Sequence, residues 1–209
     1  MKGKFIFVLG GTRSGKSEFA EKIAGGMGYP VTYIATADIA DEEMAARVKR
    51  HKERRPHHWK TVEEPKDVAT VVSKGLPGET FLLDCVTVWI SNLFFGGNEV
   101  NLDDTLHGMV NKELFVLEQV QNLVQAVRKG INLVAVAGEV GLGVVPAEES
   151  GRIFRDLAGK VNQLLASSAD EVYFVVAGVP LKIKPGEKSL QQFFPYRRRR
   201  LKTRGVLFY

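Results

Sequence analysis

Residues 5–17 read FIFVLGGTRSGKS, and this stretch indicates the fold class. The apolar residues at 5–9 predict a buried strand, and a helical pattern, SEFAEKIA, starts at residue 17. The loop between them fits G-x-x-x-x-G-K-[ST], a pattern that binds phosphate when a strand precedes it and a helix follows it. Its members are Gly10, Gly11, Thr12, Arg13, Ser14, Gly15, Lys16 and Ser17. The alternative is a chance glycine-rich turn, and both flanking elements argue against it.

The residue types of this loop suit the phosphates of a nucleotide. Glycines let the backbone curl so that successive N–H groups point at phosphate oxygens, and the helix N-terminus adds its dipole. In that geometry we expect Lys16 to reach the β- and γ-phosphates and the Ser17 hydroxyl to bind Mg²⁺. The sequence therefore predicts a nucleoside triphosphate site.

Further apolar runs, rich in β-branched and aromatic residues, occur at 31–35, 80–85, 132–137 and 171–176. Such runs are typical of parallel strands covered on both faces. Between them, helices are expected at 41–54, at 147–168 and at 102–129, where Asp103 or Asp104 could cap the start. This alternation predicts one α/β domain with a mainly parallel sheet flanked by helices. We expect the domain to span 1–187 and a basic extension to occupy 188–209.

The formal net charge of +5 would suit a polyanionic partner, but its location argues against one. The rest of the chain holds 23 basic and 24 acidic residues once the segment 196–209 is set aside. That segment holds no acidic residue and six basic ones: Arg197, Arg198, Arg199, Arg200, Lys202 and Arg204. No nucleic-acid-binding motif is recognisable, so no nucleic-acid partner is expected.

Composition and cysteine content are those of an ordinary globular protein. Of 209 residues, 44% are hydrophobic and 25% charged, which excludes disorder for most of the chain. Cys85 is the single cysteine, so no intrachain disulfide can form. No run approaches the roughly 18 apolar residues of a membrane span, and the apolar part of the N-terminus is short for a signal peptide. A cytoplasmic location is expected.

Asp84 stands at the end of the apolar run 80–85 and has two possible roles. An acidic residue at the end of a buried strand binds the metal, or its waters, in many nucleotide enzymes. It could equally be an ordinary turn residue or the cap of a helix in VTVWISNLF (86–94). The phosphate-binding loop favours the metal role, because Mg²⁺ needs a second oxygen ligand nearby.

The segment 47–63 combines basic residues with three histidines and a tryptophan, which is unusual for a solvated surface. His51 falls on the apolar stripe of its predicted helix, so a half-buried structural histidine is one interpretation. The other is a nucleophile towards phosphorus, with neighbouring Arg and Lys balancing the charge of a triphosphate. The three histidines, His51, His57 and His58, do not have the spacing of a zinc site with cysteine partners.

With these motifs in place, the sequence resembles the CobU/CobP family of bifunctional adenosylcobinamide kinase/adenosylcobinamide-phosphate guanylyltransferases. The resemblance runs in order over about 1–184, and the block from His51 to Trp59 is far more specific than the loop alone. The segments that carry it are GGTRSGKSEFAE (10–21), YIATA (33–37), DEEMAARVKRHKERRPHHWKTVEEP (41–65), LLDCVTVWISNL (82–93), EVGLGVVP (139–146) and GRIFRDLAGKVNQLLASSADEVYFVVAGVPLKIK (151–184).

The resemblance implies a role for individual residues. His51, in HKERRP, matches the histidine that becomes guanylylated, forming a GMP–imidazole phosphoramidate with loss of pyrophosphate. The positions that the family uses around GTP match Ala35, Thr36, Ala37, Lys52, Glu53, Arg54, Arg55, Glu63 and Asp84. The implied fold is a RecA-like phosphate-binding-loop domain, and family members assemble as trimers with sites near subunit contacts.

The implied chemistry has two stages. The hydroxyl of the aminopropanol arm of adenosylcobinamide, a corrinoid, is first phosphorylated from ATP or GTP with Mg²⁺. The phosphorylated arm then attacks guanylylated His51, which gives adenosylcobinamide-GDP. Two displacements at one phosphorus predict ping-pong kinetics for the second stage.

The chain departs from the family pattern in two places. Gly138 stands where the motif NEVGLGIVP has Asn, and the residues after about 187 lie outside the resemblance. Two other functions stay open on the sequence: a kinase for a small molecule without guanylyl transfer, and a RecA-like nucleic-acid-dependent ATPase that uses the basic tail.

Overall fold

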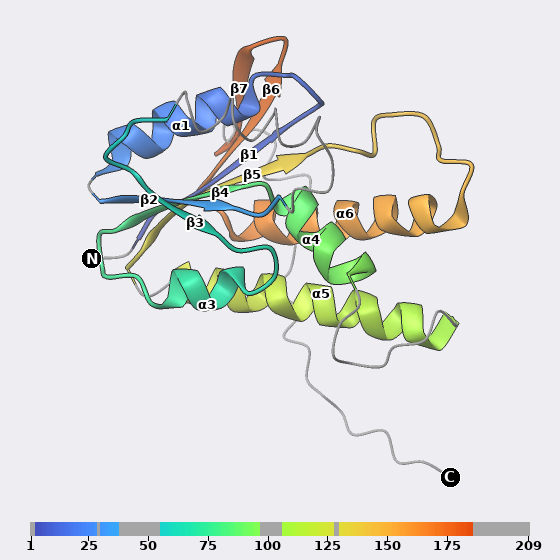
Figure 1. Ribbon diagram of the computed structural model, residues 1–209. Coiled ribbons are helices and arrows are strands. Elements are labelled where there is room, and N and C mark those ends of the chain that lie inside the picture. Colours follow the sequence, from blue (N-terminus) through green and yellow to red (C-terminus); the bar gives the residue numbers. More distant parts are fainter. Residues whose placement is uncertain (1–2, 29, 38–54, 97–105, 128–129, 186–209) are drawn as a thin grey trace.

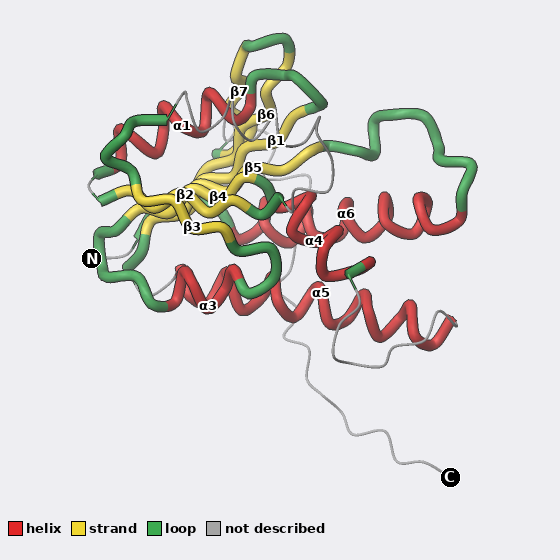
Figure 2. Tube along the Cα trace, viewed as in Figure 1, coloured by secondary structure: helices red, strands yellow, loops and turns green. Residues whose placement is uncertain are grey.

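The computed structural model describes residues 3–28, 30–37, 55–96, 106–127 and 130–185. Its centre is a seven-stranded sheet in the order β3-β2-β4-β5-β1-β6-β7 (Figure 2). Every pair of neighbouring strands is parallel except β6 and β7, which form an antiparallel hairpin. The strands are β1 (Phe5–Gly10), β2 (Val31–Ala35), β3 (Lys60–Glu63), β4 (Thr80–Asp84), β5 (Asn132–Gly138), β6 (Glu171–Val176) and β7 (Val179–Lys184).

Helices cover both faces of this sheet (Figure 1). Helix α1 lies on one face, and the other helices lie on the opposite face. Their bounds are α1 (Lys16–Met27), α3 (Val68–Ser73), α4 (Val86–Phe95), α5 (Leu106–Val127) and α6 (Glu149–Ser168). Because β1, β2, β4 and β5 are covered on both sides, nearly all of their residues are buried, as the continuous apolar runs predict.

The core has two parts, one on each face of the sheet. Side chains that alternate along β1 point to opposite faces: Phe7 packs towards α4, α5 and α6, and Val8 packs towards α1. Trp89 of α4 is fully buried in the larger part, and its indole N–H donates to Lys66 O at 2.8 Å. The sheet is therefore buried between the two parts of the core.

The predicted fold class is confirmed, and several elements differ in detail. The expected helices at 102–129 and 147–168 are α5 and α6, while the expected helix at 41–54 and the cap residues Asp103 and Asp104 lie outside the described residues. The short elements β3, α3 and β7 were not predicted. Strand β7 has no buried run, because its residues from Val179 to Ile183 are all exposed.

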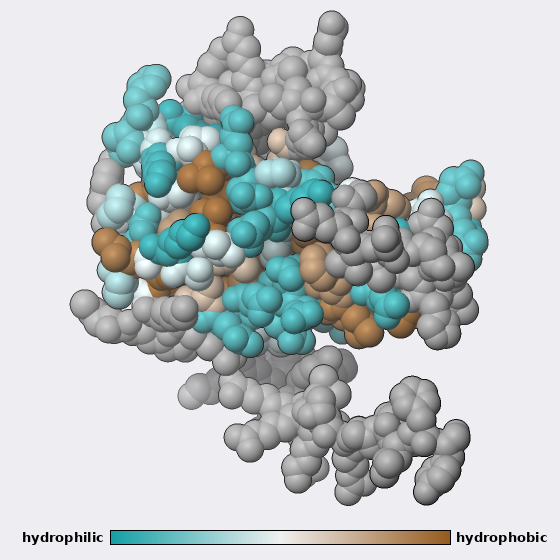
Figure 3. Space-filling view, turned by 60° about the horizontal axis from the view of Figure 1, so that its bottom comes forward, coloured by the Kyte–Doolittle hydropathy of each residue, from teal (hydrophilic) through white to brown (hydrophobic). Residues whose placement is uncertain are grey.

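None of the helices in the described ranges is long and apolar enough to cross a lipid bilayer. Viewed from the side of α3 and α5, the surface mixes hydrophilic and hydrophobic residues (Figure 3).

Glu171, at the start of β6, connects β1 to the β6–β7 hairpin. Its carboxylate lies 2.6 Å from Lys4 Nζ and 3.0 Å from Lys182 Nζ, and it accepts a hydrogen bond of 2.6 Å from the Tyr173 hydroxyl. The hydrogen bonds from Lys4 and Tyr173 lower the pKa of this carboxyl from 4.5 to about 2. The ionised Glu171 carboxylate therefore joins the residue before β1 to both strands of the β6–β7 hairpin.

Replacing Glu171 with Gln is expected to lower the free energy of unfolding at pH 7 by about 1–2 kcal/mol, because its partners are half exposed and partly screened. A carboxyl whose pKa falls on folding stabilises the fold above its unfolded pKa. That contribution is lost as the pH falls from 4.5 towards 2. Urea unfolding at several pH values should show the difference between the two proteins shrinking below about pH 4.5. A difference that stayed constant to pH 3 would contradict this assignment.

Candidate active site

The phosphate-binding loop follows β1 and opens α1, as the sequence predicts. Gly15, just before α1, has a φ of 90°, and Arg13 has a φ of 57°, so the chain turns twice through left-handed conformations. Ser14 N–H donates to Gly11 O at 3.3 Å, and Phe19 N–H donates to Gly15 O at 3.0 Å to begin the helix. This curl at a helix N-terminus is the backbone arrangement that binds phosphate oxygens.

The loop is held tightly by the strand and hairpin beside it. A Cβ at Gly10 would lie 2.5 Å from Ser14 Oγ and 2.7 Å from Val175 O, so only glycine fits there without a shift. Gly178, in the turn between β6 and β7, donates its N–H to Ser14 O at 2.9 Å. Ser14 is buried, and its hydroxyl has no hydrogen-bond partner in the described part of the chain.

Lys16, the first residue of α1, bends back over the loop. Its Nζ donates to Gly11 O at 3.1 Å, and the residue is half-buried. The ammonium group therefore lies against the backbone of the loop.

Asp84 ends β4, and β5 separates that strand from β1. The hydroxyl of Tyr33, a buried residue of β2, donates to Asp84 Oδ2 at 2.9 Å. Burial and the charge of Asp84 raise the pKa of Tyr33 well above its usual value, so the phenol stays protonated and remains a donor. The N-cap of α4 is Cys85, so Asp84 is not the cap of that helix. Tyr33 therefore orients the Asp84 carboxylate.

The oxygen groups at this edge of the sheet fit a magnesium ion. The Ser17 hydroxyl belongs to the first turn of α1, and the Asp84 carboxylate ends β4. Both are hard oxygen ligands, and Mg²⁺ typically binds one or two such side chains together with water and substrate phosphates. Among the described residues there is no cluster of three His, Cys, Asp or Glu side chains of the kind a zinc site needs.

Thr36 and Cys85 join the carboxyl ends of β2 and β4. Thr36 Oγ1 donates to Cys85 O at 2.9 Å and accepts from Cys85 N–H at 3.0 Å, and Asn92 Nδ2 donates to Thr36 O at 2.8 Å. The Thr36 side chain is fully buried in this network, between Ala35 and Ala37. Desolvation and the charge of Asp84 raise the pKa of the Cys85 thiol to about 11, so it is not a thiolate at neutral pH.

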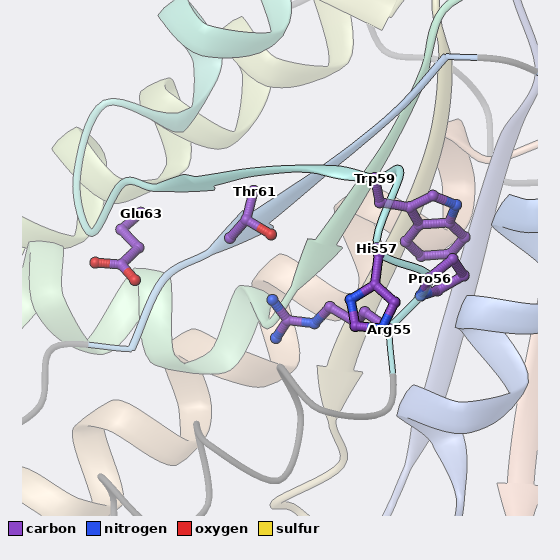
Figure 4. Close-up of a pocket in the computed structure, with 6 residues that line it drawn as sticks. All are labelled: Arg55, Pro56, His57, Trp59, Thr61 and Glu63. Atoms are coloured by element: carbon purple, nitrogen blue, oxygen red, sulfur yellow. The ribbon is translucent and has the colours of Figure 1, made fainter.

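A pocket of about 420 Å³ lies beside β3. Figure 4 shows the residues that line the pocket, with the guanidinium of Arg55 between Trp59 at one end of the view and the Glu63 carboxylate at the other. Trp59 is buried against α1, and its ring meets the helix at Gly25. The lining residues are Arg55, Pro56, His57, Trp59, Thr61 and Glu63.

Arg55 is the most unusual residue of this pocket. Only 7% of it is exposed, and its guanidinium carbon lies 3.2 Å from the centroid of the Tyr33 ring, a cation–π contact. Its Nε and Nη1 are buried and have no hydrogen-bond partner in the part of the chain that the structure describes. A buried cation with unpaired donors is costly unless an anion binds it. The pocket is therefore suited to an anionic ligand.

The structure brings the predicted residues together in two groups. Gly10, Lys16, Ser17 and Asp84 belong to the edge where β1, β5 and β4 end, while Arg55 and Glu63 share the pocket beside β3. Tyr33 connects the groups, because its hydroxyl contacts Asp84 and its ring contacts Arg55. His51, Lys52, Glu53 and Arg54 lie outside the described residues.

Sequence reasoning missed Tyr33, because a tyrosine within the apolar run VTYIA is typical of a core strand. Its hydroxyl next to the strand end that holds Asp84 could not be placed without the pairing of β2 and β4. At Gly138, where the family motif has Asn, the N–H donates to Thr87 Oγ1 at 2.7 Å. A Cβ there would lie 3.3 Å from the same oxygen, so a larger residue would press on Thr87.

Comparison with solved structures shows the fold. An ATPase from the type III secretion system of pathogenic bacteria matches with a TM-score of 0.53 and 13% sequence identity. The match covers 83% of this chain and 52% of that one. At this identity it supports the phosphate-binding-loop fold and carries no information on the reaction.

Comparison with curated proteins and family models shows the family. The "Bifunctional adenosylcobalamin biosynthesis protein CobU" of Salmonella typhimurium is 42% identical over 181 residues, 86% of this chain and 99% of that protein. The protein of the same name from Escherichia coli is 42% identical, over 86% of this chain and 99% of its own length. The "Bifunctional adenosylcobalamin biosynthesis protein CobP" of Pseudomonas aeruginosa is 39% identical, over 85% of this chain and 95% of that protein.

The model of the family described as cobinamide kinase / cobinamide phosphate guanyltransferase matches residues 6–183. The resemblance seen in the sequence is thereby confirmed, and the tail after about 187 lies beyond the match, as expected. The chain belongs to the cobinamide kinase/cobinamide phosphate guanyltransferase family, and it is an enzyme of adenosylcobalamin biosynthesis with these two activities.

Proposed function

We propose that the two activities use the two groups of residues described above. Kinase chemistry takes place at the phosphate-binding loop, and guanylyl transfer proceeds through His51 with GTP held beside β3. The observation that carries this division is Arg55, a buried cation whose Nε and Nη1 have no hydrogen-bond partner among the described residues, in a pocket whose lining includes no residue of the loop. Arg55 lies four residues after His51 in the segment 47–63, so both belong to the same stretch of chain.

In the kinase reaction, the loop residues bind the phosphates of ATP or GTP. Backbone N–H groups of residues 10–17 and the Lys16 ammonium balance the negative charge of the β- and γ-phosphates. Ser17 and Asp84 are the residues that would hold Mg²⁺, which neutralises phosphate charge when bound. Tyr33 keeps the Asp84 carboxylate oriented throughout.

In guanylyl transfer, an imidazole nitrogen of His51 attacks the α-phosphorus of GTP, and the bond between that phosphorus and the departing pyrophosphate breaks. A phosphate oxygen of the phosphorylated corrinoid then attacks the same phosphorus and displaces His51. Arg55 pairs with phosphate oxygens in the pocket. The other residues proposed to lie around GTP are Ala35, Thr36, Ala37, Lys52, Glu53, Arg54, Glu63 and Asp84.

We propose a homotrimer with sites near subunit contacts and a cytoplasmic enzyme without a nucleic-acid partner. Gel filtration with light scattering tests the oligomeric state.

Incubation with α-labelled GTP and Mg²⁺ tests the proposed guanylyl transfer. The label should stay on the denatured protein, be released by acid and pass to phosphorylated adenosylcobinamide. It should be absent from His51→Ala, because that variant lacks the nucleophile, and unchanged in His107→Ala, a control on α5. If the wild-type protein formed no adduct at saturating GTP, the histidine route would be wrong, and a kinase alone would still transfer label from γ-labelled nucleotide.

A further inference from the structure

Glu139 is an acidic residue next to the phosphate-binding loop. It follows β5 directly, and β5 lies between β1, which leads into the loop, and β4, which ends in Asp84. Gly10 and Gly138 are partners in the sheet, and Glu139 N–H donates to Gly10 O at 3.1 Å. The backbone of Glu139 is thus fixed at the first residue of the loop.

The carboxylate of Glu139 is held in place by two groups. Gly141 N–H donates to Oε1 at 2.8 Å, and Nδ2 of the buried Asn162, on α6, lies 3.4 Å from Oε2. A Cβ at Gly141 would lie 2.9 Å from Oε1, so the loop approaches the carboxylate closely because this residue is glycine. Glu139 is half-buried, so its carboxylate is oriented and still reachable from solvent.

Other carboxylates at this edge of the described sheet are less suited to act on the acceptor of the γ-phosphate. Asp84 is assigned to Mg²⁺ and accepts a hydrogen bond from Tyr33. Glu63 ends β3, four strands away from β1, which corresponds to about 19 Å at the usual spacing. Glu139 is one strand away from β1, at the level where the loop begins.

The chain that follows Glu139 gives the acceptor an apolar surface. Leu142, Val144 and Val145 are 78%, 94% and 59% exposed, and they are within six residues of the carboxylate. A corrinoid carries a large apolar ring system with the reactive hydroxyl on a flexible arm. An acceptor resting on these side chains would bring its arm to Glu139 at the edge of the phosphate-binding loop.

We propose that Glu139 is the general base of the kinase reaction, an inference that rests on the proposed division of the two activities. The carboxylate accepts the proton of the acceptor hydroxyl as its oxygen attacks the γ-phosphorus. The new O–P bond forms while the bond from the γ-phosphorus to the β–γ bridging oxygen breaks. The nucleoside diphosphate leaves with that electron pair, and the proton resides on Glu139.

The two activities of the enzyme provide a direct test. In Glu139→Gln, kcat for phosphorylation of adenosylcobinamide, followed with γ-labelled nucleotide, should fall about 100-fold or more. Guanylylation by GTP, and transfer to acceptor phosphorylated beforehand, should stay within about twofold. Gln keeps an oxygen that can accept the Gly141 N–H, so the loop keeps its shape. Glu148→Gln, which changes an exposed carboxylate before α6, should leave both activities within about twofold.

Glu139→Asp separates a base from a structural residue. Asp retains a carboxylate but is one methylene shorter, so a base role predicts more kinase activity for Asp than for Gln, and a structural role predicts the reverse order. The inference is overturned if Glu139→Gln keeps kinase activity within tenfold of wild type, or if both activities fall together. The proposed function itself would fail in a different way, with the wild-type protein unable to phosphorylate the acceptor or to form the guanylyl adduct.

Discussion

Replacing Lys16 with Ala is expected to lower kcat of the kinase reaction about 10³-fold. In the structure its Nζ reaches across the loop to Gly11 O at 3.1 Å. In the proposed kinase reaction this ammonium binds the β- and γ-phosphates. The variant has no cation to stabilise the negative charge that develops on these phosphates during transfer. Removing a single stabilising donor of this kind typically lowers kcat about 10²–10³-fold or more. A kinase assay with γ-labelled nucleotide measures the effect.

Lys22→Ala is the matched control for this prediction. Lys22 lies on the same helix, is largely exposed and pairs with Glu18 at 3.0 Å, so its loss should leave kinase activity within about twofold. Thermal unfolding of both variants should resemble wild type, because each loses one exposed interaction. Kinase activity of Lys16→Ala within tenfold of wild type would contradict the role assigned to the loop.

Replacing Arg55 with Leu is expected to lower guanylylation without lowering the stability of the fold. Guanylylation by GTP should fall about 100-fold in kcat/KM, because the pocket loses the cation that pairs with phosphate oxygens. The free energy of unfolding should stay equal or rise by about 1–2 kcal/mol. The reason is that an apolar side chain replaces a buried cation, two of whose nitrogens have no hydrogen-bond partner in the described part of the chain. Labelling with α-labelled GTP and urea unfolding measure the two effects.

Arg55→Lys distinguishes charge from geometry in this pocket. Lysine keeps the positive charge but cannot reproduce the planar stacking on Tyr33 or the forked donors of the guanidinium. We expect guanylylation between that of wild type and that of Arg55→Leu. A large loss of stability in Arg55→Leu would show instead that the guanidinium is a structural group of the fold.

The helices, strands and loop that a local sequence pattern determines were predicted from the sequence. The loop at 10–17 follows from a short motif with a strand and a helix beside it, and β1, β2, β4 and β5 follow from continuous apolar runs. Strand β7 was not predicted because it lies at the edge of the sheet, where its residues from Val179 to Ile183 are all exposed and form no buried apolar run.

The site was predictable only in part, because its geometry depends on strand order. Motif and resemblance placed Lys16, Arg55 and Asp84 near nucleotides, since each lies in a recognisable segment. The contacts of Tyr33 with Asp84 and Arg55 depend on β2 pairing with β4 and β3, which the residues of VTYIA do not reveal. The same holds for Glu139, whose place beside Gly10 follows from the pairing of β5 with β1.

The hydrogen bond from Gly178 to Ser14 has a consequence for the order in which the enzyme is completed during synthesis. The phosphate-binding loop leaves the ribosome before the hairpin turn that holds it, which is made more than 150 residues later. A nascent chain can therefore form β1 and α1 long before the loop gains this support. The nucleotide site becomes complete only when the last strands of the sheet have folded back against the first one.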